Sequence, residues 1–191
     1  MNIIFFGNGG RSLPCLEILK GLDHHIQVIV AHPENESKWY TSLAKSAAEM
    51  KIPIYSPERS NSKSFEKIIK AYNSDLFILA GYGKILSNNI IELPRKMCIN
   101  LHAGKLPEYR GSSPLNWALI NGEDCFSLSI IQLTKRIDAG PVLFEKTFSI
   151  EENTNIVDLH KIANMEFPRM LNTTIEQLDN NTFRARTQDE S

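Results

Sequence analysis

An amide and an imidazole stand two positions apart at the end of a short apolar stretch of the sequence. Met97–Leu101 is predicted to be a buried strand, interrupted only by Asn100. Side chains alternate along a strand, so Asn100 and His102 are expected to point to the same side. Gly104 and Pro107 follow, which places the pair at the carboxyl end of the strand, where open α/β sheets bind ligands. An amide donor beside a titratable imidazole, with an acid arriving from elsewhere in the chain, suits acyl transfer to an amine.

Two further motifs accompany this pair. The loop Leu106–Gly111 has the sequence Leu-Pro-Glu-Tyr-Arg-Gly, and Asp138 and Gly140 form an Asp-x-Gly motif downstream. In this order, the Asn-x-His pair, the loop and the Asp-x-Gly motif resemble those of the folate-dependent formyltransferases, and the resemblance extends more loosely from Asn2 to about Ile150. It implies a Rossmann-like fold and the transfer of a formyl group from N10-formyltetrahydrofolate, as co-substrate, to an amine.

The resemblance also implies a role for each residue of this centre. As the acceptor amine attacks the formyl carbon, Asn100 donates a hydrogen bond to the developing oxyanion. His102 stabilises the charge as an imidazolium and passes a proton to the leaving N10, while Asp138 favours the charged imidazole or positions a proton-relaying water. Taken alone, His102 would more often be a structural histidine, and Asp138 a local cap of the turn at Ala139-Gly140-Pro141.

Binding residues are also expected by resemblance. The family forms its pterin pocket largely from backbone groups at a strand end and in the loop before the acid, which here are Leu79, Gly81, Tyr82, Gln132, Arg136 and Ile137. An ordinary turn is the alternative for the strand end. Contacts to the acceptor are expected from the first glycine-rich loop, the loop after the Asn-x-His pair and the next helix, at Gly7, Asn8, Gly9, Gly10, Arg11, Tyr109, Arg110, Gly111 and Asn116.

The first loop, Gly7–Arg11, stands between a predicted strand and a predicted helix. Glycines there let backbone amides approach a phosphate at the helix N-terminus, and Arg11 adds a positive charge. The pattern does not continue as Gly-x-Gly-x-x-Gly, because Ser12 takes the last position, and the second strand ends without an acid for a ribose. A dinucleotide is therefore disfavoured. The loop either binds a phosphate or pyrophosphate of the acceptor or is a purely structural tight turn.

Composition argues against several other classes of function. The chain has 191 residues, 42% hydrophobic, and a net charge of -1 with dispersed charges, so no nucleic-acid partner is expected. No apolar stretch is long enough to span a membrane, and the N-terminus lacks the features of a signal peptide. Scattered cysteines are expected to be reduced core residues of a cytoplasmic protein, at Cys15, Cys98 and Cys125. The histidines lack ligand spacing, so no metal is expected, and His24 and His25 are predicted to be exposed.

Strand-like and helix-like segments alternate, which predicts an α/β fold with a mostly parallel twisted sheet and helices on both faces. Strands are expected at 3–6, 26–31, 52–55, 75–80, 97–101, 126–133 and 142–150. Helices are expected after Ser12 as a candidate cap and at 43–50, 65–69, 88–93, 113–123 and 154–178. The helix at 113–123 is expected to bury Leu115, Trp117 and Leu119. A single catalytic domain, 1–191, is predicted, with 151–191 a mainly helical C-terminal segment.

The acceptor is predicted from resemblance and charge together. Tyr109-Arg110-Gly111 is similar to the tRNA and sugar branches of the family, and Ser113–Glu123 is close to UDP-4-amino-4-deoxy-L-arabinose formyltransferase domains. The run Pro33–Trp39 is acidic and aromatic where the tRNA branch has a basic insertion, so phosphate-backbone binding would be weak.

A nucleotide-linked amino sugar is therefore the expected acceptor, ahead of glycinamide ribonucleotide and methionyl-tRNA. An inactive folate- or nucleotide-binding module is the alternative from another class. The chain is expected to be a minimal enzyme or a fragment without the C-terminal barrel of the tRNA branch. The sugar, the nucleotide and the oligomeric state, a homodimer included, are left open.

Overall fold

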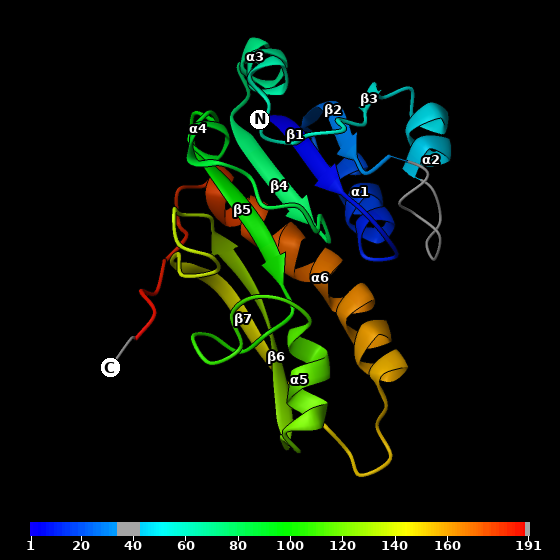
Figure 1. Ribbon diagram of the computed structural model, residues 1–191, viewed down its shortest axis with the longest axis vertical. Coiled ribbons are helices and arrows are strands. Elements are labelled where there is room, and N and C mark those ends of the chain that lie inside the picture. The colour runs from blue at the N-terminus through cyan, green and yellow to red at the C-terminus, as the bar shows by residue number, and fades with distance from the viewer. Residues whose placement is uncertain (34–42, 190–191) are drawn as a thin grey trace. The chain divides into compact units, whose positions relative to one another are not determined.

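The computed structural model describes residues 1–33 and 43–189, and Figure 1 labels their helices and strands. Residues 34–42, which include most of the acidic and aromatic run, lie outside the described residues. The chain divides into two compact units, Met1–Ile99 and Asn100–Ser191. The described strands belong to one seven-stranded, mostly parallel sheet, which confirms the predicted α/β class.

The first unit is built on four parallel strands in the order β3-β2-β1-β4. Their bounds are β1 Asn2–Gly7, β2 His25–Ala31, β3 Ile54–Tyr55 and β4 Leu76–Ala80. Ile3–Phe6 in β1 is fully buried, and every residue of β4 is buried. Parallel strands covered on both faces have continuous apolar runs rather than alternating ones, and the sequence of these strands follows that rule.

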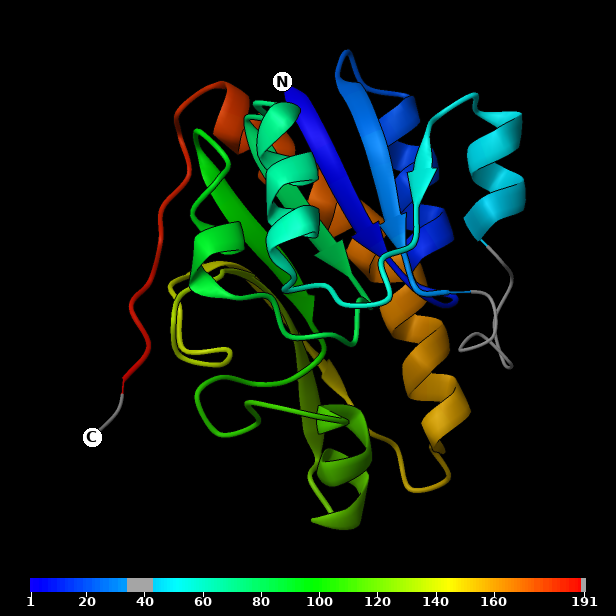
Figure 2. The ribbon, with the colours of Figure 1, turned by 45° about the horizontal axis from the view of Figure 1, so that its top comes forward.

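Four helices cover these strands: α1 Ser12–Lys20, α2 Leu43–Glu49, α3 Lys63–Ala71 and α4 Asn88–Ile91. From β1 the chain moves to β2 and β3 in one direction, and then returns to β4 on the other side of β1. Because crossovers between parallel strands are right-handed, α1 and α2 fall on one face and α3 on the other, as Figure 2 shows for α1 and α3. Helix α1 contacts α2, and α3 contacts α4.

The second unit begins within β5, Met97–His102, which carries the chain from one unit into the other. It continues with α5 Pro114–Ile120, β6 Cys125–Gln132, β7 Val142–Ser149 and α6 Ile156–Asp179. Strands β6 and β7 are antiparallel. Helix α6 starts with a capping box formed by Asn155 and Asp158, and packs on β6, β7 and α5. Strand and helix positions in both units agree with the sequence predictions to within a few residues.

Two local predictions in the first unit were wrong. Ser12 is not the cap of α1, because Arg11 holds that position. The Ser12 hydroxyl is buried and donates to the carbonyl of Ala80 over 2.6 Å, so it links α1 to the end of β4. His24 is half-buried rather than exposed, and its Nδ1 lies 2.8 Å from the N-terminal amine, whereas His25 is exposed as expected.

Two predictions of burial were also wrong in part. Helix α5 buries Leu115 as predicted, but Leu119 is only half-buried and Trp117 is 53% exposed, while Ala118 is buried. Cys15 and Cys98 are buried as predicted, but Cys125 is only half-buried. Burial raises the pKa of the Cys15 thiol to about 12, so the neutral thiol persists at physiological pH. In the described part of the chain, no helix is both long and apolar enough to cross a membrane.

Candidate active site

The Asn-x-His pair lies at the carboxyl end of β5, as predicted. Asn100 is half-buried and His102 is only 5% exposed. The chain then turns back tightly over the imidazole at Gly104. A Cβ atom on Gly104 would lie 2.6 Å from the Tyr109 carbonyl oxygen and 2.7 Å from His102 Nε2. A side chain at position 104 would therefore displace the loop that covers His102.

Asp138 joins the pair from the loop between β6 and β7. Its Oδ1 accepts a hydrogen bond from Asn100 Nδ2 over 3.4 Å, and its Oδ2 lies 3.4 Å from His102 Nδ1. Oδ2 also accepts from the backbone N–H of Gly111 over 3.0 Å. Asp138 is buried and has a φ of 47°, a left-handed conformation that aspartate tolerates better than most residues. The fold thus gathers the three predicted catalytic residues around one carboxylate.

Both ring nitrogens of His102 face oxygen atoms. Nε2 lies 2.6 Å from the carbonyl oxygen of Tyr109, and Nδ1 faces the Asp138 carboxylate. A carbonyl and a carboxylate only accept hydrogen bonds, and the imidazolium is the form of histidine that donates from both nitrogens. Both ring nitrogens of His102 therefore face hydrogen-bond acceptors.

The Asp-x-Gly motif owes its glycine to a close backbone approach. A Cβ atom on Gly140 would overlap the carbonyl oxygen of Gln132 at the end of β6. The backbone N–H of Gln132 donates to the carbonyl of Pro141 over 2.9 Å. Together these contacts close the β6–β7 loop at its base and fix where Asp138 stands.

One residue of this group was missed by the sequence analysis. Gln188 is 6% exposed, and its side-chain amide donates to the backbone carbonyls of Asp138 over 2.7 Å and Gly140 over 2.8 Å. Its Oε1 accepts from Nε and Nη2 of Arg110 over 2.9 and 2.6 Å. A lone glutamine after the last helix carries no motif, so no signal in the sequence could have found it. The Nε and Nη2 groups of Arg110, which could donate two hydrogen bonds to a phosphate, donate to Gln188 in this structure.

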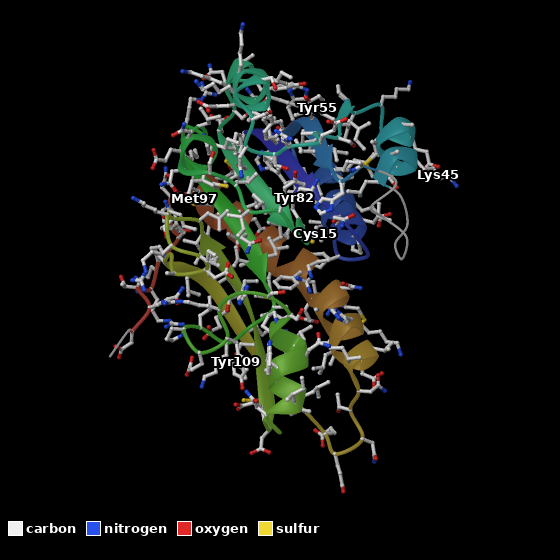
Figure 3. All side chains as sticks on the ribbon, in the orientation of Figure 1. Cys15, Lys45, Tyr55, Tyr82, Met97 and Tyr109 are labelled. Carbon is white, nitrogen blue, oxygen red and sulfur yellow. The ribbon has the colours of Figure 1, made fainter. Side chains whose placement is uncertain are left out.

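Two other residues expected to contact the acceptor also belong to the second unit. Tyr109, labelled in Figure 3, donates its phenolic O–H to Glu123 over 2.5 Å and accepts from Asn121 over 3.1 Å. The hydrogen bond to the Glu123 carboxylate raises the pKa of Tyr109. Asn116 is exposed on α5, next to the exposed Trp117. Both α5 side chains are thus accessible, and a role in acceptor binding stays a prediction for them.

The glycine-rich loop of the first unit is shaped largely by packing. A Cβ atom on Gly7 would lie 2.8–2.9 Å from side-chain atoms of Phe5, Leu43 and Ser12. On Gly81, which has a φ of +71°, it would lie 2.6 Å from the carbonyl oxygen of Asn8. Gly9 also adopts a positive φ, of 79°. Packing therefore accounts for Gly7 and Gly81, while a phosphate role for the amides of Gly9–Arg11 stays a prediction.

The residues expected to line a pterin pocket fall in both units. In the first, Leu79 and Tyr82 are buried, and the Tyr82 hydroxyl lies 2.7 Å from Ser60 Oγ (Tyr82 is labelled in Figure 3). The Tyr82 ring packs edge-on against His32, with 4.9 Å between the centroids, and His32 Nδ1 lies 3.3 Å from Asn8 Nδ2. In the second unit, Gln132 ends β6, Arg136 follows in the β6–β7 loop, and Ile137 is 57% exposed beside Asp138.

Among residues 1–33 and 43–189, no group of three or more His, Cys, Asp or Glu side chains is placed to hold a metal ion.

A sequence model of the family described as Formyl transferase matches residues 1–175. The chain belongs to this family. Among its curated relatives, the methionyl-tRNA formyltransferase of Thermodesulfovibrio yellowstonii is 33% identical over 92% of this chain and 59% of the relative. That of Clostridioides difficile is 32% identical over 84% of this chain and 53% of the relative. The chain thus spans little more than half the length of these relatives.

Solved structures share the fold at lower identity. Glycinamide ribonucleotide transformylase 1 from Symbiobacterium toebii has a TM-score of 0.83 and 18% identity, over 99% of this chain and 94% of that chain. The sugar 3N-formyl transferase WlaRD, solved in the presence of dTDP and 5-N-formyl-THF, has a TM-score of 0.81 and 18% identity, over 100% of this chain and 67% of that chain. At this identity the likeness shows the fold and leaves the substrate of this chain open.

Proposed function

We propose that this chain transfers the formyl group of N10-formyltetrahydrofolate to an amine, with Asn100, His102 and Asp138 at the reacting centre. The observation that carries the proposal is the Asp138 carboxylate, which contacts Asn100 through one oxygen and His102 through the other. Membership of the formyl transferase family supports the same reaction. The proposal covers the donor, the reaction and these three residues.

The reaction forms one C–N bond and breaks another. The neutral acceptor amine attacks the formyl carbon, and the carbonyl oxygen becomes an oxyanion that accepts a hydrogen bond from Asn100 and faces the positive charge of His102. Collapse of the tetrahedral intermediate breaks the bond from carbon to N10. The proton lost by the amine is transferred to N10 through His102, or through a water that Asp138 holds. Asp138 orients the imidazole, because its carboxylate lies 3.4 Å from Nδ1.

For the acceptor, we propose a nucleotide-linked amino sugar. The net charge of -1 offers little attraction for a polyanionic nucleic acid. The run Ser113–Glu123 is similar to the sugar branch of the family, whereas Tyr109-Arg110-Gly111 is similar to the tRNA and sugar branches alike. Asn116 and Trp117 are exposed on α5. An amide for sugar hydroxyls beside an indole for stacking would suit a nucleotide sugar.

Methionyl-tRNA is the second candidate, since both curated relatives named above carry that activity in their names and are 32–33% identical to this chain. The matched regions cover 59% and 53% of those relatives. Glycinamide ribonucleotide ranks third, because its solved transformylases share the fold at 18% identity. An inactive folate- or nucleotide-binding module is the alternative without turnover.

The test is a formylation assay with the acceptors side by side. UDP-, dTDP- and GDP-linked amino sugars, glycinamide ribonucleotide and charged initiator tRNA are each incubated with the protein and N10-formyltetrahydrofolate, and the formylated product is measured. Formylation of an amino sugar alone supports the proposal. Formylation of tRNA or the ribonucleotide alone overturns the acceptor and keeps the reaction. Binding of folate without turnover of any acceptor favours the inactive module.

A further inference from the structure

The segment after α6 returns to the strands that carry the catalytic loop. Arg186 and Val142 form a short antiparallel bridge, in which each backbone N–H donates to the carbonyl of the other over 2.8 Å. The Arg186 guanidinium adds an ion pair with Glu145 of β7 at 3.2 Å. This bridge anchors the tail two residues before Gln188, so the position of Gln188 follows from backbone hydrogen bonds rather than from its own side chain.

The Gln188 side chain uses its full hydrogen-bonding capacity. A primary amide has two N–H donors and two lone pairs on its oxygen. Here both donors are directed at backbone carbonyls of the β6–β7 loop, those of Asp138 and Gly140, and the oxygen accepts twice from Arg110. At 6% exposure, water has little access to replace any of these partners. Such complete pairing fixes the relative position of the groups it joins.

The groups joined in this way hold the catalytic carboxylate on two sides. Gln188 fixes the backbone of Asp138, while Gly111, the neighbour of Arg110, donates its N–H to Asp138 Oδ2. Gln188, Arg110, Gly111 and Asp138 therefore form a closed ring of covalent and hydrogen bonds. Asp138 adopts a φ of 47° within that ring, a conformation that the surrounding contacts must maintain.

We infer that Gln188 is a positioning residue for the catalytic group: it locks the loop of Asp138 to the loop of Arg110 and so sets the carboxylate against Asn100 and His102. It contacts none of the reacting atoms and acts through Asp138. Arg110 takes part in the same lock through its two hydrogen bonds to Gln188, so this arginine has a structural role that does not require an acceptor phosphate. The effect on catalysis rests on the proposed function, whereas the lock itself is a property of the folded chain.

The test compares three variants. Gln188→Ala removes the lock. Gln188→Glu keeps an oxygen that can accept from Arg110. Its second oxygen replaces the amide nitrogen and cannot donate to the carbonyls of Asp138 and Gly140, so only the contacts to the β6–β7 loop are lost. Arg186→Ala is the matched control, because it deletes the exposed ion pair with Glu145 and keeps the backbone bridge to Val142.

Two measurements are independent of turnover. Hydrogen exchange is followed in peptides that contain Gly111 and Ala139, and the ring ¹H–¹⁵N signals of His102 are recorded, with His102→Ala for assignment. Faster exchange in both loops and displaced His102 signals are expected in Gln188→Ala and in Gln188→Glu, while Arg186→Ala matches the wild type. Unchanged loop exchange or unchanged His102 signals in Gln188→Ala would overturn the lock.

The third measurement is kinetic. With the acceptor identified in the formylation assay, Gln188→Ala is expected to lower kcat about ten- to a hundredfold, as for a catalytic group displaced by about 1 Å, with little change in the KM for the folate. A displaced Asp138 also changes the shape of the pH dependence of kcat, which a mere loss of folded protein does not. If hydrogen exchange in the loops of Gln188→Ala rises while kcat and its pH dependence match the wild type, the positioning role of Gln188 in catalysis is refuted. If the wild type transfers no formyl group but the exchange and ring signals respond, the lock stands and the proposed function fails.

Discussion

The group around Asp138 and the glycine-rich loop Gly7–Arg11 differ in what holds them in place. At Asp138, side chains and backbone amides converge on one carboxylate, with Asn100, His102 and Gly111 all within 3.4 Å. In the glycine-rich loop, close packing against the side chains of Phe5, Leu43 and Ser12 accounts for Gly7 without any ligand. Both regions follow a strand and contain glycine, but only the first gathers groups that could carry out a reaction.

This difference bears on how glycine motifs are interpreted. Gly104 and Gly140 are needed because a Cβ atom at either position would meet backbone atoms, beside His102 and in the loop of Asp138, so their substitution would displace the groups of the candidate site. Gly7 and Gly81 are needed because strand ends and a helix meet there, so their absence would first cost stability. A glycine-rich loop is therefore weak evidence for a ligand unless convergent donors accompany it. The following predictions test that contrast.

The largest effect is expected at the Asn-x-His pair. Asn100→Ala removes a donor to the oxyanion, and a single such donor is typically worth about 10²–10³ in rate. His102→Ala removes the charge and the proton carrier, so its effect should be at least as large. Turnover with N10-formyltetrahydrofolate and melting temperature are measured together. His25→Ala, an exposed histidine in β2, is the control. Near-normal turnover of well-folded His102→Ala would contradict the catalytic role proposed for His102.

Asp138→Asn separates the charge of Asp138 from its shape. Asparagine also tolerates the left-handed conformation, so the loop should be retained. Its amide nitrogen would face either Asn100 or the donors His102 and Gly111, and no negative charge would balance the imidazolium. Loss of a hydrogen bond to a charged group, about 1.5–3 kcal/mol, corresponds to roughly a ten- to hundredfold lower kcat. If Asp138→Asn matches the wild type in kcat across the pH range, the carboxylate charge has no catalytic part.

A series of glycine substitutions should rank by the atoms that a new methyl group meets. Gly140→Ala meets the backbone of Gln132, which cannot move aside, so it is expected to destabilise most and to reduce activity as well. Gly7→Ala meets side-chain atoms and should lower the free energy of unfolding by about 1–3 kcal/mol, as for an overpacked core. Gly83→Ala, whose nearest neighbour lies at 3.8 Å, is the control. Urea unfolding gives all three values, and a reversed order contradicts the packing account.

A smaller effect is expected at Arg11 if the glycine-rich loop binds a phosphate of the acceptor. Arg11→Ala should then raise the KM for that acceptor by roughly tenfold, the equivalent of about 1.5 kcal/mol for a hydrogen bond to a charged group, with kcat unchanged. The exposed Arg59, in the same unit, serves as the control in Arg59→Ala. An unchanged KM would leave the loop with the structural role that its packing already explains.

No effect is expected from metal removal. The formyl donor is already activated for acyl transfer, so a Lewis acid would add little to the reaction. Turnover measured before and after exhaustive chelation should be equal. Stoichiometric zinc in active protein, with turnover lost on its removal and restored on its return, contradicts the prediction.

The element order and the residue types of the catalytic group were accessible from the sequence, because both depend on local pattern. Continuous apolar runs such as Ile3–Phe6 predict buried parallel strands, and the alternation of side chains predicted that Asn100 and His102 share a side. Asp138 entered only through the resemblance to the family, since nothing local distinguishes it from a turn residue. Trp117 shows the limit of pattern: α5 buries Leu115 as predicted, but it buries Ala118 rather than Trp117.

Sequence alone therefore determined which chemical groups are present and which strand carries them, whereas the tertiary structure decided how they are held. Gln188 stands 50 positions from Asp138 and 78 from Arg110, and no periodicity or motif links residues so far apart. Their contact depends on a tail returning to β7 through the bridge between Arg186 and Val142. The contact of His102 Nε2 with the Tyr109 carbonyl likewise depends on a loop that folds back at Gly104, and the contact of Nδ1 depends on the β6–β7 loop that carries Asp138. Local propensity acts over a few residues, while such pairings are fixed only when the whole unit packs.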